Sequence, residues 1–124
     1  MSVRVVIAED EAIIRLDLRE TLEEEGYEVV GETGRGDHAV DLVRELRPDV
    51  AILDIKMPHT DGIAAARMIS NEHLCAVLIL TAFSQREVVD EARDAGALAY
   101  LVKPYQKSEL LPAIALAIER FRAS

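Results

Sequence analysis

The chain has no tryptophan, a single cysteine and few aromatic residues, which make up 4% of its 124 residues. The lone cysteine, Cys75, cannot form an internal disulfide, so a reducing compartment such as the cytoplasm is expected. The sequence also lacks any run of the ~18 to 20 apolar residues that a membrane span needs. Its first residues, MSVRVVIAEDE, indicate a strand rather than a signal peptide. These absences predict a cytoplasmic protein that does not cross a membrane.

Positive charge is scarce as well, because 14 basic residues face 23 acidic ones and leave a net charge of −9. Direct nucleic-acid binding by this domain is therefore not expected, since contacts to phosphates require a basic face. Half of the residues are hydrophobic and 30% are charged, which is usual for a globular domain and excludes a disordered chain. No linker, repeat or low-complexity segment interrupts the chain, so the sequence predicts a single domain that is large enough to bury a core.

Short apolar runs alternate along the chain with segments of helical period. The predicted strands are residues 3–8, 28–31, 50–53, 76–80 and 97–102. Apolar stripes predict helices over residues 14–22, 88–95 and 110–121, and the segments 37–46 and 62–70 make the remaining two. Most of the strand runs are nearly continuous, which is typical of parallel strands covered on both faces. Five successive strand–helix units predict an α/β domain with a doubly wound, five-stranded parallel sheet flanked by five helices.

Polar residues follow four of the five predicted strands. They are Glu9, Asp10 and Glu11 after the first strand, Asp54 after the third, Thr81 after the fourth, and Lys103 and Pro104 after the fifth. An acid at a strand end is more often a helix cap or a solvated turn, and a lysine there is more often a surface charge. The joint pattern favours a site, because the carboxyl ends of parallel strands meet at one edge of the sheet.

The chemistry of this set points to a cation and a phosphoryl group. Carboxylates packed together repel one another, and oxygen ligands without histidine or cysteine favour a hard ion such as Mg2+. Beside Mg2+, one carboxylate can act as a nucleophile toward phosphorus and form an aspartyl phosphate. Lys103 would then counter the charge of the phosphoryl oxygens, and the Thr81 hydroxyl would donate a hydrogen bond to one of them.

Four short motifs with this order and placement carry a resemblance to a known family. They are IAEDE with the acidic pair Glu9-Asp10, LDIKMPHTDG with Asp54, LTAF with Thr81, and AYLVKP with Lys103. Together they resemble the receiver domain of bacterial two-component response regulators, over nearly the whole chain from about Val3 to Phe121. The resemblance implies a flavodoxin-like sheet over residues 1–124, with the output domain absent from this chain.

The resemblance also implies roles for individual residues. Asp54 would accept a phosphoryl group from a sensor histidine kinase, with Mg2+ held by Asp10, Asp54 and the main-chain carbonyl of Lys56, and with Glu9 assisting through water. Receivers usually have two aspartates at the acidic pair, whereas this chain begins the pair with a glutamate.

Further positions match the family outside the acidic set. Tyr100 matches the aromatic switch position, which rotates inward when Thr81 moves toward the phosphoryl group. The Lys103-Pro104 bond is expected to be cis. Pro58 and Gly62 are expected to shape the loop after Asp54. Phe83, like Lys56, is expected to tune how readily water reaches the aspartyl phosphate, and His59 lies where a kinase could contact the loop.

These implications predict a phosphorylation-dependent signalling switch rather than an enzyme, although the domain would assist its own phosphorylation and dephosphorylation. The sequence from LTAF to the last helix resembles receivers of the ANTAR class, whose RNA-binding output domain prevents transcription termination. The expected partners are a sensor histidine kinase, an output domain if the full gene product has one, and a second copy of the chain in a homodimer.

Two other classes of function are open at this stage. A haloacid-dehalogenase-like phosphohydrolase also forms an aspartyl phosphate, but it needs an Asp-x-Asp motif and this chain has Lys56 at the second position. A pseudo-receiver would act as a constitutive docking module, which the intact acids, Thr81 and Lys103 argue against.

Overall fold

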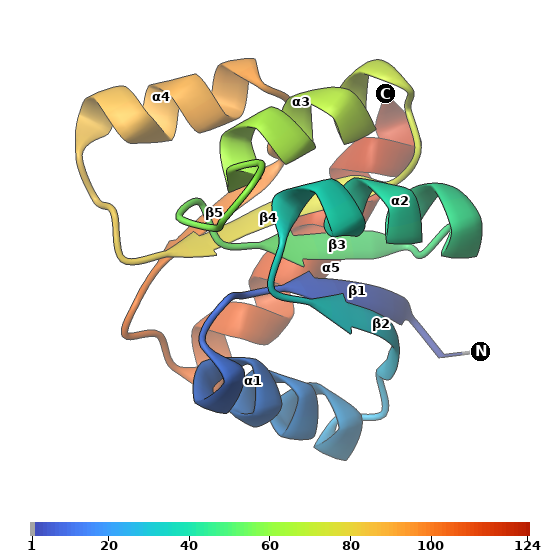
Figure 1. The fold of residues 1–124 in the computed structure, drawn as a ribbon. Coiled ribbons are helices and arrows are strands. Elements are labelled where there is room, and N and C mark those ends of the chain that lie inside the picture. Colours follow the sequence, from blue (N-terminus) through green and yellow to red (C-terminus); the bar gives the residue numbers. More distant parts are fainter. Residues whose placement is uncertain (1) are drawn as a thin grey trace.

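Five parallel strands form the centre of the computed structural model, which describes residues 2–124. The strands are β1 (Arg4–Ala8), β2 (Glu28–Thr33), β3 (Val50–Leu53), β4 (Ala76–Thr81) and β5 (Ala99–Val102), in the order β2-β1-β3-β4-β5. The helices between and after them are α1 (Ala12–Glu24), α2 (Gly36–Leu46), α3 (Gly62–Asn71), α4 (Arg86–Asp94) and α5 (Lys107–Ala123). Figure 1 shows the alternation of strand and helix that the apolar runs predict, and it confirms the doubly wound α/β fold.

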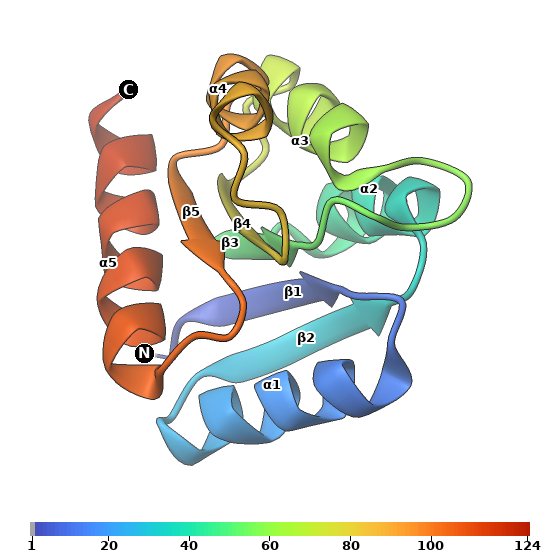
Figure 2. The same ribbon diagram turned by 90° about the vertical axis from the view of Figure 1, so that its left-hand side faces the viewer.

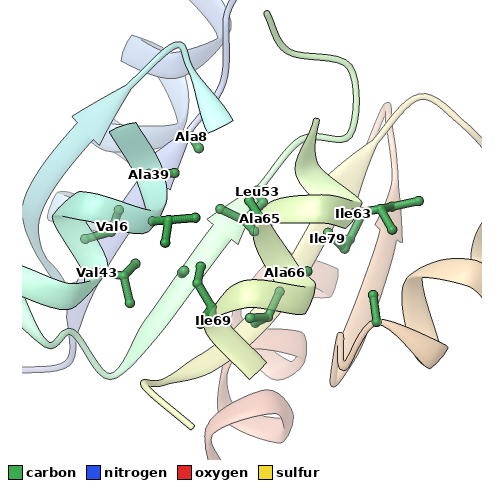
Figure 3. Packing of buried hydrophobic residues seen from close by; sticks show 14 of the residues in the cluster. Val6, Ala8, Ala39, Val43, Leu53, Ile63, Ala65, Ala66, Ile69 and Ile79 are labelled. Carbon is green, nitrogen blue, oxygen red and sulfur yellow. The ribbon is translucent and has the colours of Figure 1, made fainter. Parts of the chain in front are cut away.

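The helices form two layers around the sheet, with α1 and α5 on one face and α2, α3 and α4 on the other (Figure 2). Each face has its own hydrophobic cluster. Buried residues of α1 and α5 pack on one side of the sheet, including Leu18, Leu22, Leu110 and Ile114. Figure 3 shows the opposite cluster, in which Ala39 and Val43 of α2 and Ala65 and Ile69 of α3 pack over the central strands. None of the helices within residues 2–124 has the length and apolar character to cross a membrane.

Strand β2 is longer than the sequence predicts, because it continues through Glu32 and Thr33. The predicted end at Gly31 was wrong because polar residues follow it. The β1–β2 register shifts between Val5 and Val6, and after this irregularity Glu32 and Thr33 still pair with β1. Since β2 lies at the edge of the sheet, its polar side chains need not be covered on both faces.

Strand β3 leads from the core directly into the loop that contains the candidate nucleophile. All four of its residues are buried, and β1 and β4 pair with it on either side. The N–H of Asp54 donates to the carbonyl of Ala8 at 2.9 Å, which extends the β1–β3 ladder by one residue. The loop then closes where the N–H of Gly62 donates to the carbonyl of Ile55 at 2.8 Å. Asp54 is therefore held at the carboxyl end of β3, the central strand of the sheet.

Cys75 lies immediately before β4, and its side chain is buried. Burial raises the pKa of its thiol to about 12. Because the thiolate is the reactive form, we expect the folded protein at pH 8 to react with a disulfide reagent on the order of 1000-fold more slowly than the chain in concentrated urea. Stopped-flow thiol labelling measures both rates, and equal rates would contradict the buried placement.

Candidate functional site

The structure brings the predicted acids together at the carboxyl end of the sheet. Glu9 and Asp10 follow β1 and Asp54 follows β3, and one carboxylate oxygen from each lies within 4.8 Å of the others. Glu9 is buried, Asp54 is half-buried and Asp10 is exposed. Three carboxylates therefore face one small volume, and each can offer an oxygen to a cation.

Lys103 follows β5 and reaches across the sheet edge to two of these acids. Its ammonium donates to Asp54 Oδ2 at 3.0 Å and also hydrogen-bonds to Glu9 Oε1. Burial by itself would lower the pKa of Lys103, but the hydrogen bonds to Glu9 and Asp54 outweigh it and raise the pKa. The side chain therefore stays cationic and neutralises part of the acidic cluster.

Glu9, which stands where the receivers that this chain resembles usually have an aspartate, is 3% exposed. Its second carboxylate oxygen, Oε2, accepts a hydrogen bond from the N–H of Glu11 at 3.1 Å. Burial raises the pKa of the Glu9 carboxyl, and the hydrogen bonds from Lys103 and the Glu11 N–H oppose this shift only in part. The longer side chain of glutamate thus places its carboxylate between Lys103 and the start of α1.

Thr81 is the last residue of β4 and is 1% exposed. Its main-chain carbonyl accepts from the N–H of Lys103 at 2.8 Å, which ties the ends of β4 and β5 together. Among the buried side-chain nitrogen and oxygen atoms of residues 2–124, the Thr81 hydroxyl oxygen alone has no hydrogen-bond partner. A buried polar group without a partner is costly, so this hydroxyl needs an explanation.

A cavity of about 440 Å³ opens over this cluster. Its lining residues are Asp10, Glu11, Ile14, Asp54, Lys56, Thr81, Ala82, Phe83 and Lys103. The sequence places Ile14 only in the apolar stripe of its helix, whereas the structure leaves it half-buried among the residues that line the cavity. Its apolar side chain has the same character as those of the stripe, so nothing in the sequence distinguishes it.

Tyr100 and Phe83 are linked by a hydrogen bond that the sequence does not reveal. The Tyr100 hydroxyl donates to the main-chain carbonyl of Phe83 at 2.8 Å. Burial, together with the charge of Asp54, raises the pKa of this hydroxyl. The bond connects β5 to the loop that follows Thr81, so a displacement of that loop would break this bond or move the Tyr100 side chain.

The loop between β3 and α3 contains the remaining predicted positions. Pro58 and His59 are exposed, neither lines the cavity, and His59 has a positive φ of 71°. Asp61 caps α3, since its side chain accepts from the N–H of Ala64 at 2.8 Å. On the other side of the site, the Lys103-Pro104 bond is cis.

Gly62 makes the closest approach between this loop and the site. A Cβ atom built there would lie 1.9 Å from the main-chain oxygen of Asp54. The sequence marked Gly62 only through its place in the LDIKMPHTDG motif. The structure shows that the backbone of α3 passes directly against the backbone of the candidate nucleophile.

Many known proteins resemble this chain in sequence or in fold. The family described as the response regulator receiver domain matches residues 5–115. Transcriptional regulatory protein PdtaR of Mycobacterium tuberculosis (strain H37Rv) is 59% identical over 96% of this chain and 58% of its own length. The chain thus spans less than two thirds of that relative. Chemotaxis protein CheY of Thermotoga maritima is 37% identical over 92% of this chain and 96% of its own length.

Solved structures agree with these relatives. The signal receiver domain of the putative response regulator NarL from Mycobacterium tuberculosis superposes with a TM-score of 0.91, at 31% identity over 95% of this chain and 97% of that one. The family match covers residues 5–115, and the order of strands and helices agrees with it. The chain belongs to the response regulator receiver domain family.

Proposed function

We propose that this receiver domain is a phosphorylation-driven switch in which Asp54 accepts a phosphoryl group from a sensor histidine kinase. The observation that carries the proposal is the buried, unpartnered Thr81 hydroxyl, which lines the same cavity as Asp54 and Lys103. A phosphoryl group on Asp54 would supply oxygens for that hydroxyl and for the Lys103 ammonium. The cost of the orphaned hydroxyl would then be removed in the phosphorylated state.

The residues present fit a bound Mg2+ ion. Three carboxylates that converge within 4.8 Å, without histidine or cysteine, form the all-oxygen donor set that this ion prefers. Glu9, Asp10 and Asp54, together with the main-chain carbonyl of Lys56, would hold it. When bound, the ion supplies positive charge that offsets the negative charge of the incoming phosphoryl oxygens.

The side chains of the site would carry out the transfer as follows. A carboxylate oxygen of Asp54 attacks phosphorus, and the bond between phosphorus and the donor breaks, with its electron pair leaving on the donor. The Lys103 ammonium, which contacts Asp54 Oδ2 at 3.0 Å, then binds a phosphoryl oxygen, and the Thr81 hydroxyl donates to another. The Thr81 bond is new in the phosphorylated state and contributes roughly 1.5 to 3 kcal/mol, whereas the Lys103 bond replaces one that this ammonium already makes to Asp54. A shift from about 1:99 to 99:1 between two states needs about 5.5 kcal/mol, so the Thr81 bond supplies a part of the required free energy.

Phosphorylation with a small donor tests this function directly. The chain is incubated with Mg2+ and acetyl phosphate, and the modified residue is mapped by mass spectrometry. Stoichiometric label on Asp54 that requires Mg2+ supports the switch. Rapid turnover of many phosphoesters would instead identify a phosphohydrolase, and the absence of label would identify a pseudo-receiver that acts as a docking module.

We further propose that the switch controls transcription through a separate output domain. The name of the relative PdtaR describes a transcriptional regulatory protein, and this chain matches only 58% of its length. The ANTAR-like sequence after Thr81 makes an RNA-binding antiterminator the favoured output. In this assignment the receiver is a cytoplasmic regulatory domain, not a phosphohydrolase, and pairing of two copies through α4, β5 and α5 would be its route to a homodimer.

Replacement of Thr81 by alanine is expected to separate phosphorylation from the response. Asp54 and Lys103 remain, so the variant should still take up phosphate from acetyl phosphate. The conformational change should be largely lost, because a hydrogen bond to a charged group of about 1.5 to 3 kcal/mol no longer favours the switched state. Amide hydrogen exchange of the loop after β4 and of Tyr100, with and without phosphorylation, measures the response. Thr81→Ser keeps the hydroxyl and serves as the control, and a full response in Thr81→Ala would refute the coupling.

A further inference from the structure

Arg15 reaches the acidic site from α1 without lining its cavity. Helix α1 lies along β2 (Figure 2), and the Arg15 side chain points back to the end of β1. Its guanidinium donates from Nη1 to the main-chain carbonyl of Glu9 at 2.6 Å. This carbonyl lies just beyond the β1–β3 ladder, in which the preceding carbonyl, that of Ala8, accepts from Asp54. Arg15 thus supplies the hydrogen bond for the first carbonyl of this segment that β3 does not bond.

Two further features hold the guanidinium in this place. Glu32, near the end of β2, accepts from Arg15 Nε at 3.4 Å. Gly34 also lies against the guanidinium, because a Cβ atom built there would lie 3.3 Å from Arg15 Nη1 and 3.3 Å from Asp10 Cα. A side chain at Gly34 would therefore crowd both the arginine and the acidic pair. Arg15 occupies a space that three separate segments of the chain form.

Every polar group of Glu9 takes part in a hydrogen bond. Its N–H donates to the carbonyl of Thr33 at 2.9 Å, and its carboxylate accepts from Lys103 and from the Glu11 N–H. The contact from Arg15 fixes the last polar group, the main-chain carbonyl. Because Glu9 and Asp10 are adjacent in the chain, the orientation of this peptide determines how both carboxylates are presented.

We propose that Arg15 is a positioning residue for the cation site, and that it acts by fixing the Glu9–Asp10 peptide. This inference rests on the proposed function, in which these two acids hold Mg2+. Partners that orient metal ligands from outside the ligand set typically contribute 10- to 100-fold to metal affinity. We expect the lower end of this range, about 10-fold, because Arg15 contacts one main-chain carbonyl.

The direction in which Arg15→Ala changes the affinity for Mg2+ distinguishes a positioning role from a purely electrostatic one. Arg15→Ala removes a positive charge close to three carboxylates, which by itself would strengthen the binding of a cation. If Arg15 positions the acids, the same substitution weakens Mg2+ binding instead. Arg19→Ala is the matched control, since Arg19 also pairs with Glu32 and carries the same charge but, within residues 2–124, forms no hydrogen bond with Glu9.

The experiment measures the melting temperature of each variant over a series of Mg2+ concentrations, which gives the half-saturating concentration without any phosphorylation step. Arg15→Ala is expected to raise that concentration about 10-fold relative to Arg19→Ala. Arg15→Lys keeps the charge and a donor nitrogen but not the planar guanidinium, which can bond Glu9 and Glu32 at once, so its half-saturating concentration should fall between those of the parent protein and Arg15→Ala. A lower melting temperature without Mg2+ does not count as support, since a purely structural arginine would also cause it.

Two outcomes overturn the inference in distinguishable ways. If the parent protein shows stabilisation by Mg2+ and Arg15→Ala binds the ion as tightly or more tightly, Arg15 does not position the site while the proposed function stands. If the parent protein shows no stabilisation by Mg2+, the cation site itself is refuted, and the role of Arg15 falls with it.

Discussion

Replacement of Asp54 by asparagine is expected to reduce phosphoryl uptake from stoichiometric to none. The amide oxygen of asparagine is a poor nucleophile, and the amide group removes the negative charge that Lys103 contacts at 3.0 Å. The fold should persist, because the asparagine oxygen can still accept from the N–H of Ile55, as Asp54 Oδ1 does at 2.7 Å. Phosphate-affinity electrophoresis or intact-mass spectrometry after incubation with acetyl phosphate and Mg2+ gives the measurement.

The neighbouring Asp61 supplies the control for this variant. It lies in the same loop and is exposed, and its side chain caps α3 by accepting from Ala64. Asp61→Asn retains the cap, since asparagine is as good an N-cap residue as aspartate. We expect this variant to be labelled like the parent protein. Label that persists in Asp54→Asn but disappears in Asp61→Asn would move the phosphoacceptor to Asp61.

Replacement of Gly62 by alanine is expected to produce the second large effect, a loss of about 3 kcal/mol in the free energy of unfolding. The added methyl group would lie 1.9 Å from the main-chain oxygen and 2.7 Å from the carbonyl carbon of Asp54, as well as 2.9 Å from Ile55 Cα. These are backbone atoms and cannot rotate away as a side chain could. The loop must therefore shift, and we expect slower phosphorylation of Asp54 in addition. Urea denaturation and the rate of labelling by acetyl phosphate measure the two effects.

Gly26→Ala is the comparison that isolates close packing from backbone strain. Gly26 follows α1 with a φ of +85°, and a Cβ atom there would meet nothing within 4 Å. Alanine at this position should cost about 1 kcal/mol from the left-handed conformation alone and leave the labelling rate unchanged. A Gly62→Ala variant no less stable than Gly26→Ala would contradict the close approach of α3 to Asp54.

The hydrophobic pattern by itself determined the fold class and the edge at which the site forms. Four consecutive buried residues in β3 can be recognised from the run VAIL, because a central parallel strand is covered on both faces. The carboxyl ends of parallel strands share one edge of the sheet. The sequence alone therefore predicts that Asp54, Thr81 and Lys103 lie close together. The receiver motifs then assigned a role to each of them, and the structure places all three around one cavity.

The tertiary structure decided which groups contact one another within that edge. The unpartnered hydroxyl of Thr81, the bond from Tyr100 to the Phe83 carbonyl and the contact of Arg15 with the Glu9 carbonyl have no signature in the sequence. Each depends on the distance between atoms from different elements, and that distance is set by the twist of the sheet and the packing of α1 and α3 rather than by residue spacing. Periodicity reports which face a residue occupies, whereas hydrogen-bond partners require atoms within about 3 Å of one another.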